Sequence, residues 1–160
     1  MEFRPGQAEG VLQAMADITQ AGDGWINLLP GIDEEDAPPR PTGLSAILAP
    51  RLGGAVMGTW TPQVQGRRGT EGASIGLMHP AGRFAARQLA SLGAAVPEGW
   101  VIRQDHARRG LILQAPIGAA HLDIVNWIIA AATALNTLPT TGEWRADIYL
   151  PKSPRDPARG

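Results

Sequence analysis

Residues 73–151 decide the fold, and they read ASIGLMHPAGRFAARQLASLGAAVPEGWVIRQDHARRGLILQAPIGAAHLDIVNWIIAAATALNTLPTTGEWRADIYLP. Hydrophobic periodicity along this stretch predicts strand, helix, strand, strand, helix and strand. The six expected elements cover residues 74–79, 84–92, 100–105, 110–115, 119–135 and 144–150. The wide apolar stripe of the second helix is the strongest of these signals.

Turn residues mark the boundaries of these elements. Gly72 and Pro80 flank the first strand, and Gly93 offers a left-handed end to the first helix. Gly110 suits the positive φ of a hairpin loop formed by residues 106–109. The last strand alternates apolar and polar residues, which predicts one buried face and one wet face.

This order of elements is the split βαββαβ pattern of ferredoxin-like domains, an α+β fold. Right-handed crossovers would place the first and third strands in the centre of the sheet and the second and fourth at its edges. The compositions agree, because residues 75–78 and 111–113 are apolar whereas the expected edge strands carry arginine and aspartate. The face of the central strands that the helices leave uncovered then needs extra strands, another helix or a second subunit.

The N-terminal part of the chain is expected to extend or cover this sheet. Pro5 suits the first turn of a helix that continues to about residue 20, and a strand follows at residues 25–29. Residues 44–48 and 55–60 have the pattern of a hairpin.

Two polar loops, at residues 33–43 and 62–72, interrupt this part of the chain. We therefore expect one α+β domain over residues 1–151, with an N-terminal extension over residues 1–61, the βαββαβ unit over residues 73–151 and a disordered tail at residues 152–160.

Composition narrows the classes of function. The chain has 160 residues, no cysteine and a net charge of −1. The absence of cysteine excludes thiolate chemistry and a disulfide framework, and Lys152 as the single lysine argues against Schiff-base and Walker-type chemistry. No signal peptide or bilayer-spanning apolar run is visible, so we expect a cytoplasmic protein without membrane contact and without a cofactor.

The charges are segregated along the chain. Residues 1–61 hold three basic and eight acidic groups, whereas residues 62–110 hold seven basic and three acidic groups. Solvated loops of different composition would explain this pattern. Alternatively, the acidic loop Asp33–Asp36 lies near Arg67, Arg68, Arg108 and Arg109, within one chain or across a dimer.

Gly72-Ala73-Ser74-Ile75-Gly76 matches the G-x-S-x-G pattern of serine hydrolases, and Asp105 and His121 follow in the order that those enzymes use. A nucleophile elbow joins a strand to a helix, whereas Ser74 would begin a strand. The context therefore argues against an acyl-transfer triad. His121 is expected to be a helix N-terminal residue without a catalytic role.

The candidate catalytic residues are His79, Asp105 and His106. His79 would end the first strand of the unit, while Asp105 and His106 would open the hairpin turn. Imidazole is the usual general base near neutral pH, but turn and helix-entry roles explain the same residues. The chain has three histidines without metal-ligand spacing, so no metal site is predicted.

Arginines near these residues are the candidate ligand-binding groups, because the guanidinium fork binds carboxylate or phosphate at two points. They are Arg83, Arg87, Arg108 and Arg109. Nucleic-acid binding is not expected, because residues 109–113 carry aliphatic side chains where RNA-recognition modules carry base-stacking aromatics.

No residue set in the chain forms a motif that fixes an activity. One hypothesis is a non-catalytic α+β module that forms a homodimer or another homo-oligomer, or that binds a small apolar ligand. The alternative is a small-molecule enzyme that acts on an anionic substrate with an acid–base group formed by His79, Asp105 and His106.

Overall fold

The computed structural model describes residues 1–33, 35–36, 55–66 and 69–150. They form a mixed α/β structure around a seven-stranded sheet in the order β1-β9-β2-β3-β6-β8-β7, and every neighbouring pair is antiparallel. The strands are β1 (Glu2–Phe3), β2 (Trp25–Pro30), β3 (Met57–Thr61), β6 (Ser74–Met78), β7 (Val101–His106), β8 (Gly110–Gln114) and β9 (Trp144–Tyr149).

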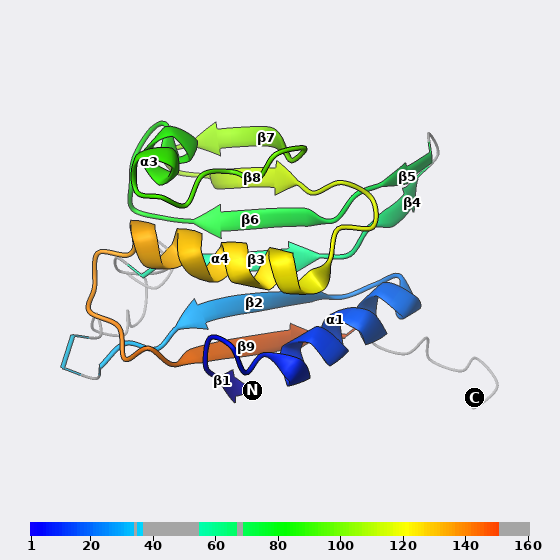
Figure 1. Cartoon of the computed structure of the whole chain (residues 1–160), viewed down its shortest axis with the longest axis horizontal. Coiled ribbons are helices and arrows are strands. Elements are labelled where there is room, and N and C mark those ends of the chain that lie inside the picture. Colours follow the sequence, from blue (N-terminus) through cyan, green and yellow to red (C-terminus); the bar gives the residue numbers. More distant parts are fainter. Residues whose placement is uncertain (34, 37–54, 67–68, 151–160) are drawn as a thin grey trace, which may run out of the picture.

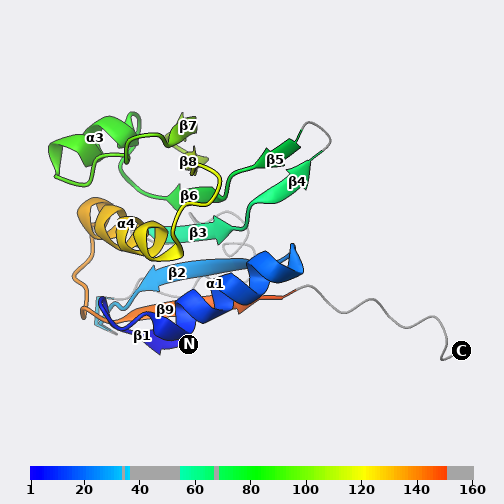
Figure 2. The same cartoon turned by 45° about the vertical axis from the view of Figure 1, so that its right-hand side comes forward.

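The helices α1 (Glu9–Ala21), α3 (Ala85–Ser91) and α4 (His121–Leu135) lie on one face of this sheet (Figures 1 and 2). Alternate residues of the central strands are buried beneath them, as the period of two requires. The core between the two layers includes Ile26, Trp60, Ile75, Leu77, Leu111, Leu113 and Ile128.

The six elements predicted for residues 73–151 are confirmed. β6 and β7 are both antiparallel to β8, so they run parallel to each other, and α3 connects them. The central positions of β6 and β8 and the edge position of β7 are also confirmed.

The expected edge position of the last strand is wrong, because β9 lies between β1 and β2. In the four-strand ferredoxin-like order, β9 and β6 would be neighbours. Here β2 and β3 lie between them. Two strands of the N-terminal part are therefore inserted into the middle of the sheet and are not added at its edge. The last expected residue of this strand, Leu150, is 63% exposed and lies outside the core.

The N-terminal helix begins later than expected. α1 starts at Glu9 rather than near Pro5, because residues 2–3 form β1 and pair with β9. Gly10 is accommodated within α1, where a Cβ would meet the Met1 Sδ atom at 2.8 Å. The helix ends as predicted before Gly22, which has a φ of 73°.

Residues 55–60 were expected to pair with residues 44–48 in a hairpin. Instead, β3, which covers most of the second segment, pairs with β2 on one side and β6 on the other. Residues 44–48 and the tail at residues 152–160 lie outside the described residues. The predicted loop at residues 62–72 is wrong in part. It contains β4 (Val64–Gly66) and β5 (Gly69–Glu71), which form a small separate sheet that projects from one end of the molecule (Figure 1).

The contact between α4 and β3 is close. Gly58 is buried in β3, and a Cβ at this position would lie 2.2 Å from the Ile128 Cγ2 atom. The buried side chains of α4 are Ile124, Val125, Trp127, Ile128, Ala131, Ala132 and Leu135. Leu122, in the first turn of α4, is 48% exposed and does not belong to this buried stripe.

The other face of the sheet carries no helix among the described residues (Figure 2). Trp25 and Tyr149 stack there with their ring centroids 4.8 Å apart, and Thr59 Oγ1 donates a hydrogen bond to Asn27 Oδ1. None of the described helices is long and apolar enough to cross a membrane.

Candidate functional site

The residues predicted to carry chemistry gather at one end of the sheet. Because β6 and β7 run parallel, the loop after β6 and the turn after β7 lie at the same end. Figure 1 shows α3 at that end. His79, Asp105 and His106 are thus near Arg83, Arg87, Arg108 and Arg109 in the fold.

Asp105 caps α3 from the neighbouring strand. Its two carboxylate oxygens accept hydrogen bonds from the backbone N–H groups of Ala85 and Ala86, at 3.0 and 3.1 Å. The residue before this helix, Phe84, has no capping side chain and a φ of 63°. The carboxylate therefore holds the helix entry in place.

His79 is 9% exposed, and its Nδ1 atom accepts a hydrogen bond from the Ala81 N–H at 3.2 Å. This bond places the proton of the neutral ring on Nε2, which is buried without a hydrogen-bond partner among the described residues. Burial lowers the pKa of His79, and the charge of Asp105 opposes part of this effect. His79 is therefore a neutral histidine in a turn.

The other candidate site residues in this cluster are either exposed to solvent or already engaged in contacts within the protein. The Nδ1 atom of His106 accepts the N–H groups of Arg108 and Arg109 at 3.1 and 3.3 Å, which closes the hairpin turn. Arg83 is exposed, and the guanidinium of Arg87 lies 5.4 Å from the centre of the Phe84 ring. The arginines are accessible, but the three candidate catalytic residues all have structural hydrogen bonds.

Ser74, Asp105 and His121 do not form a triad. Ser74 begins β6 and Asp105 lies near the end of the parallel strand β7, so they are at opposite ends of the sheet. His121 begins α4 on the covered face.

The acidic loop makes no ion pair with Arg108 or Arg109 within the described ranges, where the ion pairs are Arg4–Glu143 and Arg145–Asp147. Arg67, Arg68 and Glu34 lie outside those ranges.

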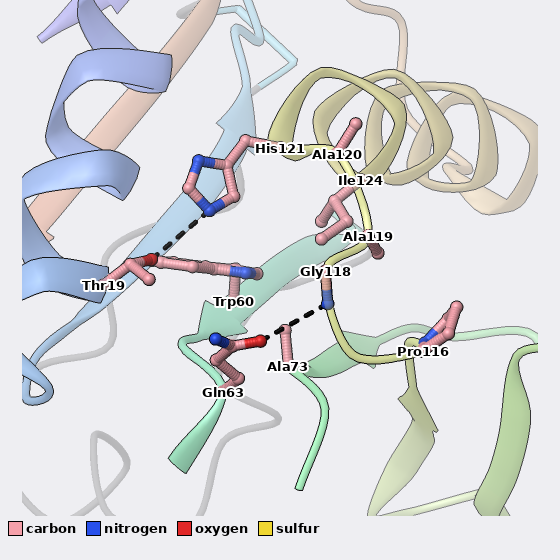
Figure 3. A pocket seen from close by; sticks show the side chains of 10 residues that line it. All are labelled: Thr19, Trp60, Gln63, Ala73, Pro116, Gly118, Ala119, Ala120, His121 and Ile124. Carbon is pink, nitrogen blue, oxygen red and sulfur yellow. Dashed lines mark hydrogen bonds between the residues drawn. The ribbon is translucent and has the colours of Figure 1, made fainter. Parts of the chain in front are cut away.

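A cavity of about 320 Å³ lies at the N-terminal end of α4, away from α3 and the cluster described above. It is open to solvent and lies between the end of α1, the end of β3, the start of β6 and the loop that leads from β8 into α4 (Figure 3). Its lining residues are Thr19, Trp60, Gln63, Ala73, Pro116, Gly118, Ala119, Ala120, His121 and Ile124. This volume is at the lower end of the range found for small-molecule sites.

Trp60 forms the floor of this cavity. It is 1% exposed, and its Nε1–H donor has no hydrogen-bond partner among the described residues. Figure 3 shows the indole nitrogen on the side of the ring that faces Ile124 and Gly118. By contrast, the buried Trp127 Nε1 donates to the Ala95 carbonyl oxygen at 2.9 Å. A buried donor without an acceptor costs free energy, so the unpaired Trp60 nitrogen requires an explanation.

His121 closes one side of the cavity. The Thr19 hydroxyl donates to the Met15 carbonyl oxygen at 2.8 Å, so it accepts from His121 Nε2, 3.3 Å away. The His121 ring meets Trp60 edge-on, with centroids 5.5 Å apart. Burial lowers the pKa of His121, which favours the neutral ring that this hydrogen bond orients.

Gln63 spans the cavity from the other side. Its Oε1 atom accepts the Gly118 N–H at 3.4 Å, which links the end of β3 to the loop before α4 (Figure 3). The amide NH2 group of Gln63 is left as a donor.

A second cavity of about 510 Å³ lies beside the base of the β4–β5 arm, and Ser74, Arg103 and Gln114 line it. Arg103 donates to Gln114 Oε1, with its Nε atom 2.9 Å away, so part of its guanidinium group is already engaged. The smaller cavity, with its unpaired buried donor, is therefore the better candidate site.

Sequence reasoning missed this site. Trp60 and His121 are far apart in the chain, and no local pattern relates them. His121 was expected only to begin a helix, which it does, and its contact with Trp60 arises from the packing of α4 on β3. No group of three or more metal-ligating side chains occurs in the part of the chain that the structure describes.

The chain matches no protein-family model, and it has no significant match among curated proteins or among solved structures. The geometry of the cavity is therefore the basis for assigning a function.

Proposed function

We propose that the protein is a small-ligand-binding module and that the cavity between α1, β3 and α4 is its binding site. The observation that carries this proposal is the Nε1–H donor of Trp60: the residue lines the cavity, and its buried donor has no partner among the described residues. A ligand acceptor at this position would remove the cost of the unpaired donor.

The lining supports binding rather than chemistry. Neutral His121 is engaged with Thr19, and the described residues that line the cavity include no lysine, arginine, aspartate or glutamate. The walls formed by Ile124, Ala73 and Pro116 would supply apolar contact.

The test is a thermal-shift screen of small metabolites with a cavity-filling variant. A ligand that binds the folded state raises the melting temperature. We expect Ala119→Leu, which narrows the cavity, to abolish the shift, whereas Ala90→Leu on the exposed surface of α3 should keep it. A shift that survives in Ala119→Leu would place the ligand elsewhere and reject the proposal.

The alternative function is an enzyme acting on an anionic substrate at the other end of the sheet. The convergence of His79, Asp105 and His106 with exposed arginines favours it. The hydrogen bonds of these three residues to backbone N–H groups weigh against it, because a general base needs a free lone pair.

We further propose two features of the architecture. Residues 73–151 would be a ferredoxin-like unit that β2 and β3 have opened. A second copy of the chain would cover the sheet face without helices, where Trp25 and Tyr149 are 42% and 41% exposed.

A further inference from the structure

We infer that the ligand of this cavity carries a carboxylate or an equivalent oxyanion, bound by Trp60 Nε1 and by the uncapped N-terminus of α4. This inference rests on the proposed function, because it names the chemical class of ligand for the same site.

The first observation is the N-terminus of α4. The N-cap residue, Ala120, has extended backbone angles (φ −64°, ψ 132°), and no side chain in the described ranges caps the helix. The N–H groups of residues 121–123 therefore lack both an intrahelical acceptor and a cap. Because the helix dipole is positive at this end, an anion is the favoured occupant. Ala119, Ala120 and His121 place this end in the cavity lining (Figure 3).

The second observation is independent of the helix. The Trp60 side chain comes from β3 and lines the same cavity, and its buried Nε1–H donor has no hydrogen-bond partner among the described residues. An indole N–H can only donate, so its partner must be an acceptor.

The lining offers further donors beside the Trp60 nitrogen. The Oε1 atom of Gln63 is occupied by Gly118, which leaves NH2 as the available group. The carbonyl oxygen of Pro116 accepts the Ala119 N–H. The NH2 group of Gln63 and the N–H groups at the start of α4 are thus donors that a carboxylate would match, whereas the Nδ1 atom of neutral His121 is an acceptor.

One charge opposes the anion. Asp123 lies in the first turn of α4, where a carboxylate complements the helix dipole, although it is exposed and makes no capping hydrogen bond. Replacing the Asp123 carboxylate with a neutral group should therefore increase the affinity for an anion, whereas removing a hydrogen-bond donor should decrease it.

Isothermal titration with benzoate, benzamide and inorganic phosphate tests the inference. Benzamide matches benzoate in size but has no charge. We expect an oxyanion to bind, and benzamide to bind at least about tenfold more weakly than benzoate, because hydrogen bonds to a charged acceptor are stronger.

Ala120→Ser is the decisive variant, because a serine at the N-cap position would occupy the N–H groups itself. We expect its melting temperature to rise by about 2–4 °C while benzoate affinity falls about tenfold. Ala130→Ser, at an exposed position of the same helix, is the matched control and should bind benzoate like the wild type. Asp123→Asn should bind benzoate more tightly than the wild type.

Trp60→Phe gives a second test, because it removes the Nε1–H donor of the indole ring. Trp100→Phe is its control. Loss of benzoate binding in the first variant alone is the expected result.

Equal affinity for benzoate and benzamide, or unchanged benzoate binding in Ala120→Ser, would overturn the inference. So would the failure of both anions to bind at millimolar concentration. Binding of neutral compounds that Ala119→Leu abolishes would still support the proposed function, so the two failures can be told apart.

Discussion

Two buried nitrogen atoms, Trp60 Nε1 and His79 Nε2, lack hydrogen-bond partners in the described part of the chain. They differ in their surroundings. Trp60 lines a cavity that can hold a ligand, whereas His79 lines neither of the two cavities described above. The unpaired donor of Trp60 can therefore be satisfied by binding, while the unpaired donor of His79 is a cost to the fold.

We expect His79 to make the stability of the fold depend on pH. Burial lowers the pKa of His79 in the folded state below its ordinary value of 6.5, so the unfolded chain binds its proton first as the pH falls. The free energy of unfolding should be unaffected by His79 well above pH 6.5 and should decrease as the pH falls through 6.5 toward the folded pKa. Each unit of lowering corresponds to about 1.4 kcal/mol.

Urea unfolding at several pH values checks this prediction. His79→Asn keeps an acceptor for the Ala81 N–H but does not titrate, so it should lose less stability than the wild type between pH 7.5 and 5.5. His106→Asn makes the same change in a neighbouring turn and serves as the control. Parallel curves for the wild type and His79→Asn would show that His79 does not cause the loss.

The sequence predicted the roles of single residues only where a local pattern existed. Gly93 and Gly110 were placed correctly, with φ values of 82° and 81°, because their turns are short-range. The contacts of Asp105 with Ala85 and Ala86 and of His121 with Thr19 join separate elements, so they require the packed structure.

At the scale of elements, the N-terminus of α3 depends on a neighbouring strand. The helix has seven residues, and its N-terminus is held by a side chain from β7. We expect Asp105→Ala to reduce the free energy of unfolding by about 1–2 kcal/mol, as for the loss of an N-cap. Hydrogen exchange should show faster opening of residues 85–91. Asp105→Asn retains one acceptor oxygen and should lose less stability.

If Asp105→Ala leaves stability and exchange unchanged, the carboxylate does not support α3. The enzyme alternative would then gain weight, because Asp105 would be free to act on His79.

The packing of α4 on β3 gives a prediction with a matched pair of glycines. Gly58→Ala would place a Cβ 2.2 Å from Ile128 Cγ2, whereas Gly76→Ala would place one 3.9 Å from Thr59 Cβ on the other face. We expect the first change to lower the free energy of unfolding by about 1–3 kcal/mol, as other overpacked cores do. The second should cost less than about 0.5 kcal/mol.

Chemical denaturation of both variants measures the difference. Combining Gly58→Ala with Ile128→Ala should cost less than the sum of the two single changes, since the clash disappears. Equal costs for the two glycine variants would contradict the close packing of α4 on β3.

At the scale of the whole molecule, the sequence predicted the elements of residues 73–151 but not the complete sheet. Period and turn residues identify a strand, but its neighbours depend on contacts that are distant in the chain. The two-residue strand β1 is too short for a periodic signal, and its pairing with β9 moved that strand from the edge. The cavity was not predictable for the same reason, because four segments that are distant in the chain form it.

The proposed dimer can be tested at this scale by light scattering. The wild type should be a dimer, and Trp25→Glu should dissociate it by placing a charge on the sheet face without helices. Leu92→Glu, at a residue that is 56% exposed near α3, is the control and should leave the dimer intact. A wild type that stays monomeric at high concentration would reject this arrangement.

The most direct test of the binding proposal is the indole N–H region of a ¹H–¹⁵N spectrum during titration with benzoate. The chain has five tryptophans, and Trp60→Phe identifies the resonance of Trp60. We predict that the Trp60 Nε1–H signal moves downfield and becomes protected from exchange as it gains an acceptor, while the Trp25 and Trp100 signals stay in place. Binding of benzoate that leaves the Trp60 signal unmoved would contradict the assignment of this cavity as the ligand site.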